Sequence, residues 1–273
     1  MSSLDRFELE RALDVAKEAA RRAGELQRAG MRRAHQVEFK GAFNLVTEVD
    51  RQCERAILET LQRGVPGAAV LAEESRPDTR SEGLLWVIDP LDGTTNYTHG
   101  YPFFCSSIAL MDKGRPVIGV VYDPLRDEMF SAVRGRGAWQ NGEHIRASQT
   151  RELERALLAT GFPYDRREQP DTNLDRFCLL SLRTRGVRRG GSAAMDLCMT
   201  ACGRLDGYWE IRLCPWDVVA GALIVEEAGG KITDLSGRPY DWSGAETLAS
   251  NGLLHPVLIE ALAEKAPHGR CFG

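Results

Sequence analysis

The spacing of apolar positions changes along the chain, and each change marks a different kind of predicted element. Residues 5–29 carry an apolar residue every three or four positions among Arg, Lys and Glu, which predicts an amphipathic helix ending near Gly30. A second helix is predicted to begin near Thr47, because Thr47 and Asp50 have the spacing of a capping box. The chain therefore begins with two helices that each have one apolar face.

Two apolar runs that follow predict short buried strands. The first covers residues 68–71 and ends at an acidic pair. The second covers residues 84–88 and is followed by Pro90, which has no backbone N–H and is predicted to end the strand. On this prediction, Asp89 and Asp92 lie just beyond a strand end.

The next part of the chain, residues 103–147, has short apolar runs separated by tight turns. Asp-Lys-Gly at 112–114 and Asn-Gly at 141–142 are typical of hairpin turns. An antiparallel meander is predicted, with strands at residues 105–111, 117–122, 128–133 and 138–140.

In the second half of the chain, strand and helix patterns alternate. Strands are predicted at residues 157–159, 205–210, 231–233 and 247–249. Helices are predicted at residues 173–183, 195–202, 216–228 and 256–265. A meander followed by this alternation predicts a layered α/β fold. We expect a single domain over residues 1–273, with halves at about 1–147 and 148–273.

Composition and charge narrow the class of protein. The 273 residues are 43% hydrophobic, which is enough for a large core, and the net charge of −4 gives no basic surface for nucleic acid. No apolar run approaches the roughly 20 residues of a membrane span. The seven cysteines are scattered, and the first residues lack signal-peptide features. We therefore expect a cytoplasmic protein with reduced thiols.

The candidate chemistry is concentrated in residues 86–97, Trp-Val-Ile-Asp-Pro-Leu-Asp-Gly-Thr-Thr-Asn-Tyr. The carboxylates of Asp89 and Asp92 suit Mg²⁺, which prefers oxygen ligands. Gly93 and Thr94 follow at a predicted turn or helix start, where free backbone N–H groups suit a phosphate. A metal site beside an anion site is what phosphate-ester hydrolysis requires. The alternative for these residues is a polar surface turn.

Further acidic residues have both an ordinary and a functional interpretation. Asp50 and Asp217 each stand in the first turn of a predicted helix, where a carboxylate stabilises the helix dipole by about 0.3–1 kcal/mol. Glu73 and Glu74 are either exposed charges at a strand end or part of a site. Glu210 ends the strand before Asp217 and faces the same end of the fold if the connection is short.

A covalent route has little support, because Cys105 has no histidine or basic residue near it in sequence. Direct attack by water is favoured.

Together these residues resemble the inositol monophosphatase family of metal-dependent phosphatases, over nearly the whole chain. Residues 86–97 carry the most specific match. Ala72 departs from the pattern, because the family more often has Gly before its Glu pair. Three other segments match: Asn-Leu-Val-Thr-Glu-Val-Asp at 44–50, Glu-Glu-Ser at 73–75 and Trp-Asp-Val-Val-Ala-Gly-Ala at 216–222.

The resemblance implies a site with two or three Mg²⁺ ions. Glu73, Asp89 and the backbone carbonyl of Leu91 would bind the first ion. Asp89, Asp92 and Asp217 would bind the second. Glu73 would also hold a weaker third ion.

The resemblance also implies roles in catalysis and substrate binding. Thr94 and Asp50, with Glu73, would be the catalytic residues that orient a water activated by the metal. Lys40 matches a family lysine near the site. The residues implied to contact the phosphate or the substrate hydroxyls are Asp92, Gly93, Thr94, Ala193 and Glu210.

At the level of the whole protein, the resemblance implies an αβαβα sandwich of the inositol monophosphatase and fructose bisphosphatase type. A homodimer inhibited by Li⁺ is expected, acting on inositol monophosphate without binding nucleic acid or membrane directly. Other small phosphate esters remain open as substrates: fructose 1,6-bisphosphate, histidinol phosphate, dinucleotide phosphates or adenosine bisphosphate. A second open function is that of a protein partner in transcription, with phosphatase activity secondary.

Overall fold

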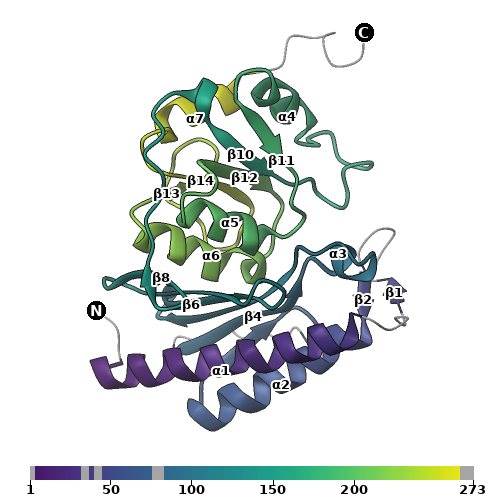
Figure 1. Ribbon diagram of the computed structural model, residues 1–273, viewed down its shortest axis with the longest axis vertical. Coiled ribbons are helices and arrows are strands. Elements are labelled where there is room, and N and C mark those ends of the chain that lie inside the picture. The colour runs from purple at the N-terminus through teal and green to yellow at the C-terminus, as the bar shows by residue number, and fades with distance from the viewer. Residues whose placement is uncertain (1–3, 32–36, 40–44, 76–82, 265–273) are drawn as a thin grey trace.

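Helices and sheets alternate in five layers in the computed structural model, which describes residues 4–31, 37–39, 45–75 and 83–264 (Figure 1). Two long helices form one outer layer and two shorter helices form the other. Two sheets lie between them, and a pair of helices lies between the sheets. The predicted αβαβα sandwich is therefore confirmed.

The first outer layer consists of α1 (Arg6–Gly30) and α2 (Glu48–Gly64). Both begin at capping boxes, on Asp5 and Thr47, so the helix start predicted near Thr47 is confirmed. A small antiparallel pair, β1 (Val37–Phe39) and β2 (Leu45–Thr47), precedes α2 and was not predicted. A row of small residues lets α1 pack closely on its neighbours: Ala12, Ala16, Ala19, Ala20 and Ala23.

The larger sheet has seven strands in the order β3-β4-β5-β6-β7-β8-β9. Only β3 and β4 run parallel, and the rest form the predicted antiparallel meander. The predicted hairpin turns have left-handed residues, with φ of 51° at Asn141 and 86° at Gly142. The strands are β3 (Ala69–Ala72), β4 (Leu84–Asp92), β5 (Cys105–Asp112), β6 (Arg115–Asp123), β7 (Glu128–Val133), β8 (Gly137–Gln140) and β9 (Glu143–His144).

The predicted end of the central strand at Pro90 is wrong, because β4 continues to Asp92. Asp89 pairs with Ser107 and Asp92 with Cys105, so three steps on β4 oppose two on β5. This extra residue is a β-bulge, where a ladder hydrogen bond is already missing and proline is tolerated. Asp89 and Asp92 therefore belong to the last part of the strand and do not lie beyond its end.

The middle layer consists of α5 (Ala193–Ala201) and α6 (Pro215–Glu227), which lie between the two sheets. Most residues of α6 are buried, as expected for a helix covered on two faces. A Cβ on Gly119 of β6 would lie 2.6 Å from the carbonyl oxygen of Ala220. Glycine therefore allows the close approach of α6 to the larger sheet.

The smaller sheet has the order β11-β10-β12-β14-β13 and is covered by the second outer layer. Its strands are β10 (Leu157–Thr160), β11 (Gly186–Arg188), β12 (Gly207–Ile211), β13 (Lys231–Thr233) and β14 (Glu246–Ser250). The short, basic β11 was not predicted, because it has too few apolar residues to read as a strand. The covering helices are α4 (Leu174–Ser181) and α7 (His255–Ala263), with a 3₁₀ turn at Leu153–Arg155.

No helix in the described ranges is long and apolar enough to cross a membrane.

Candidate active site

A pocket forms where the ends of β3 and β4, the loop after β10 and the connection from β12 to α6 meet. Of the predicted site residues that the structure describes, all line it except Asp50 and Ala193. The pocket is lined by Glu73, Asp89, Leu91, Asp92, Gly93, Thr94, Phe162, Pro163, Tyr164, Glu210, Arg212, Leu213, Cys214, Trp216 and Asp217.

The bulge of β4 places two carboxylates at the base of the pocket. Asp89 Oδ1 accepts a hydrogen bond from the backbone N–H of Leu91 at 2.9 Å. Asp92 Oδ2 accepts from the hydroxyl of Ser192 at 2.6 Å and from the N–H of Ala194 at 2.8 Å. These bonds engage one oxygen of each carboxylate. Each carboxylate is therefore oriented, and its other oxygen can bind a metal ion or substrate.

Ser192 is a site residue that the sequence analysis missed. It is the N-cap of α5, and its oxygen accepts from the N–H of Met195 while its hydroxyl donates to Asp92. The small-residue loop before α5 was the only signal for it in the sequence.

Thr94 begins the short helix α3 (Thr94–Thr98) directly after Gly93. The φ of 96° at Gly93 turns the chain sharply from β4 into α3, and at a helix start the first N–H groups lack intrahelical acceptors. The hydroxyl of Thr94 lies 2.9 Å from Asp50 Oδ1 and 3.0 Å from the Leu91 carbonyl oxygen. Asp50 therefore reaches the pocket through Thr94, although it does not line it.

Asp217 lies in the first turn of α6, after Pro215, and is the acidic residue of its capping box, whose N-cap is Cys214. Its Oδ2 accepts from the N–H of Cys214 at 2.7 Å. Asp217 therefore has the ordinary helix-capping contact and also faces the pocket.

The two residues of the acidic pair, Glu73 and Glu74, have different surroundings. Glu73 lines the pocket, and its N–H donates to the Ile88 carbonyl at 3.1 Å, which continues the pairing of β3 with β4. Glu74 is not one of the lining residues, and its N–H donates to Glu54 of α2. The pocket thus includes Glu73 and not Glu74.

Burial and mutual repulsion disfavour the ionised forms of these carboxylates. The pKa of Asp89 is raised well above its ordinary value, first by burial and then by Glu73, Asp92 and Asp217. The pKa of Asp217 is raised by burial and by the charges of Asp92 and Glu73. Burial also raises the pKa of Asp92 to about 6. A nearby cation would remove this electrostatic cost.

The donor set fits a hard divalent cation. Of the five carboxylate residues that line the pocket, the four proposed as metal ligands are Glu73, Asp89, Asp92 and Asp217, and Leu91 lines the same pocket. Mg²⁺ binds through oxygen with few protein ligands. Among the residues that the structure describes, no three His, Cys, Asp or Glu side chains already form a tight metal-binding cluster. The predicted Lys40 lies outside the described residues, as does Asn44.

Glu210, on β12, also lines the pocket. Its carboxylate accepts from the Tyr208 hydroxyl at 2.5 Å, and burial raises its pKa to about 7. A Cβ on Gly161 would overlap this carboxylate, so glycine leaves it room. Ala193 is buried and is not one of the residues that line the pocket.

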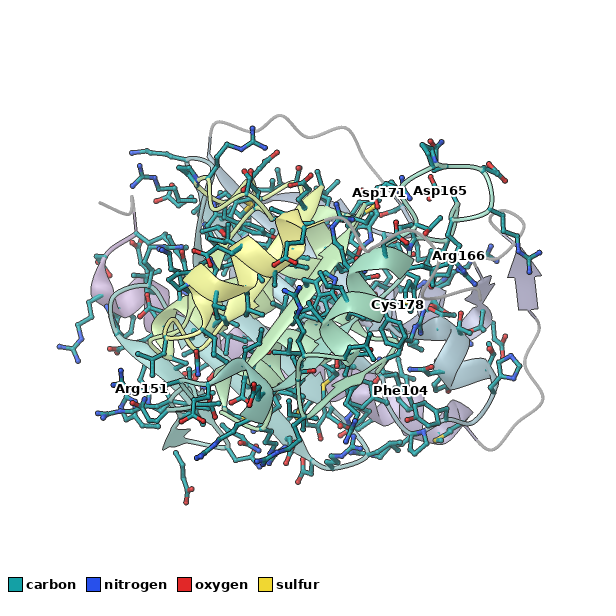
Figure 2. All side chains as sticks on the ribbon, turned by 90° about the horizontal axis from the view of Figure 1, so that it is seen from above. Phe104, Arg151, Asp165, Arg166, Asp171 and Cys178 are labelled. Atoms are coloured by element: carbon teal, nitrogen blue, oxygen red, sulfur yellow. The ribbon has the colours of Figure 1, made fainter. Side chains whose placement is uncertain are left out.

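The loop between β10 and α4 supplies further lining residues that the sequence analysis missed: Phe162, Pro163 and Tyr164. Arg212 holds this loop through an ion pair with Asp165 at 3.1 Å and a hydrogen bond to the carbonyl oxygen of Asp171. Figure 2 shows Asp165 and Asp171 at the same edge of the molecule. The loop has no apolar periodicity, so no pattern in the sequence indicated that it covers the site.

A thiol nucleophile is disfavoured, as predicted. Cys105 Sγ is buried 3.6 Å from Ser192 Oγ and 4.0 Å from Asp92 Oδ2, and burial raises its pKa well above the ordinary value. None of the cysteines in the described ranges forms a disulfide.

The fold and pocket define a class of phosphatases with clustered carboxylates, and comparisons with known proteins agree. The model of the inositol monophosphatase family matches residues 8–267. An inositol-1-monophosphatase of Synechocystis sp. is 47% identical over 258 residues, which cover 94% of this chain and 90% of that protein. The solved inositol monophosphatase of Anabaena (Nostoc) sp. has a TM-score of 0.86 at 47% identity, covering 94% of this chain and 96% of that one. A Nus factor SuhB of Pseudomonas aeruginosa is 43% identical over 262 residues, covering 93% of this chain and 97% of that protein.

The chain therefore belongs to the inositol monophosphatase family. It is a phosphatase of a family that depends on metal ions.

Proposed function

We propose that this protein hydrolyses inositol monophosphate to inositol and phosphate, with Mg²⁺ as its cofactor. The observation that carries the proposal is the meeting of Glu73, Asp89, Asp92 and Asp217 in one pocket beside the turn at Gly93. The relatives named inositol monophosphatase support the choice of substrate.

The residues present would hold two ions, and Glu73 would share in a weaker third. Glu73, Asp89 and the Leu91 carbonyl would hold the first ion, and Asp89, Asp92 and Asp217 the second. When bound, a pair of divalent cations lowers the pKa of water and stabilises charge on the attacking and leaving oxygens.

Thr94 and Asp50 would orient the attacking water. The Thr94 hydroxyl has one proton and two acceptors, the Leu91 carbonyl and Asp50. Donation of that proton to Asp50 would leave a lone pair on the Thr94 oxygen for a further hydrogen bond. That lone pair would accept a hydrogen bond from water and fix its direction of approach.

The substrate would be held at both ends. The N–H groups of Gly93 and Thr94, at the start of α3, would donate to phosphate oxygens. Asp92 and Glu210 would accept hydrogen bonds from the substrate hydroxyls, and Ala193, next to the Ala194 N–H that holds Asp92, would also contact the substrate.

The experiment that tests this function is phosphate release from inositol 1-phosphate, with Mg²⁺ and with EDTA, beside a panel of esters. The panel contains fructose 1,6-bisphosphate, histidinol phosphate, a dinucleotide phosphate and adenosine bisphosphate. Mg²⁺-dependent release with the highest kcat/KM for the inositol ester supports the proposal. A higher value for another ester keeps the chemistry and assigns a different substrate.

A role as a protein partner in transcription is the second candidate, because relatives at 43% identity are named Nus factor SuhB. The full set of carboxylates favours retained phosphatase activity in either case. Pull-down with Asp92→Asn tests this role: enrichment of RNA polymerase subunits supports it, and none contradicts it.

For the whole protein we propose a single domain over residues 1–273 that assembles as a homodimer in the cytoplasm. It would bind neither nucleic acid nor membranes directly, which agrees with its net charge of −4. Li⁺ would inhibit it by competing at a Mg²⁺ position. Light scattering measures the mass in solution, and a Li⁺ titration of activity measures the competition.

A further inference from the structure

The peptide group between Pro90 and Leu91 lies inside the β4 bulge, between two proposed metal ligands. Its N–H, on Leu91, donates to Asp89 Oδ1 at 2.9 Å. Its carbonyl oxygen, on Pro90, accepts from Gln27 Nε2 at 2.8 Å and from Ser106 Oγ at 3.2 Å. Because a peptide group is planar, these contacts hold opposite edges of one rigid unit.

Gln27 lies 63 positions before Pro90 in the chain. It belongs to α1, in an outer layer of the fold. Its side chain is fully buried, and its Nε2 also donates to Ser106 Oγ at 3.0 Å. The Pro90 carbonyl can only accept a hydrogen bond, so the NH₂ end of the Gln27 amide must face the bulge. The orientation of this amide therefore follows from the chemistry of its neighbours.

Burying a polar side chain at this position costs free energy of folding, so the contact of Gln27 with the bulge indicates a specific role. Within the described part of the chain, Gln27 Oε1 is buried with no hydrogen-bond partner. Leaving a buried acceptor unpaired costs free energy, and an apolar side chain would pack between α1 and the sheet without that cost. Packing alone thus does not account for Gln27, whereas the need to hold the Pro90 carbonyl does.

The backbone of Gln27 also contacts the segment that follows the bulge. The Tyr97 hydroxyl, from the end of α3, donates to the Gln27 carbonyl at 2.8 Å. Tyr97 is held in turn by an edge-to-face contact with Phe104, with ring centroids 5.0 Å apart. One residue of α1 therefore holds the bulge through its side chain and α3 through its backbone.

We infer that Gln27 is a positioning residue for the metal site: it fixes the Pro90–Leu91 peptide plane, and the N–H of that plane orients the Asp89 carboxylate. This inference rests on the proposed metal binding at Asp89. Without the Gln27 donor, the Pro90 carbonyl keeps only Ser106, and rotation of the plane would carry the Leu91 N–H away from Asp89. The plane also sets the position of Leu91, whose own carbonyl is a proposed ligand held by Thr94 at 3.0 Å.

Binding of Mn²⁺ alone, followed by electron paramagnetic resonance without substrate, tests the inference in Gln27→Leu. The substitution keeps the size of the side chain and removes the donor. The expected result is a Kd about 10-fold higher, as for other groups that orient metal ligands. Leu9→Ala is the matched control, because Leu9 is a buried residue at the far end of α1. We expect that control to lower the Tm and leave the Kd for Mn²⁺ unchanged.

The outcomes separate this inference from the proposed function. If the wild type binds Mn²⁺ and Gln27→Leu binds it equally well, only the inference is overturned. An equal weakening in Leu9→Ala also overturns it, because the effect then comes from loss of stability. If the wild type binds no Mn²⁺, the proposed metal site fails and the inference fails with it.

A second measurement does not depend on metal. Hydrogen exchange of the Leu91 amide, measured by NMR in EDTA, is expected to be faster in Gln27→Leu than in the wild type. Ser106→Ala removes the other donor to Pro90 with a smaller change in volume, and a smaller acceleration is expected. Unchanged exchange of Leu91 in both variants would overturn the inference.

Discussion

The hydroxyl of Thr94 lies 2.9 Å from Asp50 Oδ1, although 44 positions separate the two residues in the chain. The other oxygen of Asp50 accepts from the N–H and the hydroxyl of Thr47, which caps α2. Helix capping and contact with the site were alternatives for Asp50 at the level of sequence. In the structure one carboxylate does both, because its two oxygens face different neighbours.

This pair leads to a prediction about turnover. Thr94→Val removes the hydroxyl that would orient water, so we expect kcat to fall by roughly 100-fold or more. Asp50→Asn should give a similar loss, and the double variant should lose little more, since the two groups act as one unit. Kinetics on inositol 1-phosphate measure these values. Additive losses in the double variant would contradict a shared role.

Asp92 provides a direct test of the metal site. Asp92→Asn keeps an oxygen for the Ser192 hydroxyl and the Ala194 N–H, so we expect the protein to stay folded. It loses a charged ligand, and kcat/KM should fall by at least about 100-fold. The control is Asp241→Asn, because Asp241 is exposed and its contacts are with Ser243. Circular dichroism checks the fold, and normal turnover in a folded Asp92→Asn would exclude Asp92 as a ligand.

Glu210 should make the stability of the metal-free protein depend on pH. Burial raises its pKa in the folded state from 4.5 to about 7, so the folded protein keeps a proton that the unfolded chain releases. The resulting stabilisation is present below pH 4.5 and is lost as the pH rises to 7. Allowing for partial exposure of the side chain, the loss is about 2 kcal/mol.

Urea unfolding in EDTA between pH 4.5 and 8 measures the Glu210 effect. Glu210→Gln does not titrate, so its free energy of unfolding should fall less over this range than that of the wild type. Parallel curves for the two proteins would show that Glu210 does not hold a proton in the folded state.

His255 should have the opposite effect on stability. Its ring is buried between the hydroxyls of Thr233 and Ser250, each 2.8 Å away, and burial lowers its pKa to about 4. The Thr233 hydroxyl donates to the Asp234 carbonyl, so it accepts from Nε2–H of His255, and Nδ1 accepts from Ser250. The folded protein therefore holds the neutral ring down to about pH 4, whereas the unfolded chain binds a proton below about pH 6.5.

The His255 contribution is thus fully present above pH 6.5 and is lost as the pH falls to 4. After reduction for screening by solvent, the loss is about 2 kcal/mol. His255→Asn should be less stable than the wild type at pH 7.5, and the difference should narrow at pH 4.5. Chemical unfolding at both pH values measures it, and a constant difference would contradict the low pKa.

Several features of this protein were determined by short stretches of sequence. The capping box at Thr47 and the Asn-Gly turn at 141–142 were predicted, because the residues that form them are neighbours in the chain. The same holds for the chemistry of residues 86–97, where two carboxylates, a glycine and a hydroxyl stand together. Local signals of this kind do not depend on how the layers stack.

Only the tertiary structure decided how β4 ends and what surrounds it. Pro90 was predicted to stop the strand. The register shift against β5 instead creates a bulge, where no ladder hydrogen bond requires the N–H that proline lacks. Ser192 reaches Asp92 across 100 positions, and Gln27 reaches Pro90 across 63. These contacts depend on α5 lying on one face of the larger sheet and α1 on the other. Neither Ser192 nor Gln27 is linked to residues 86–97 by a helix or strand periodicity, so no pattern along the chain could have predicted these contacts.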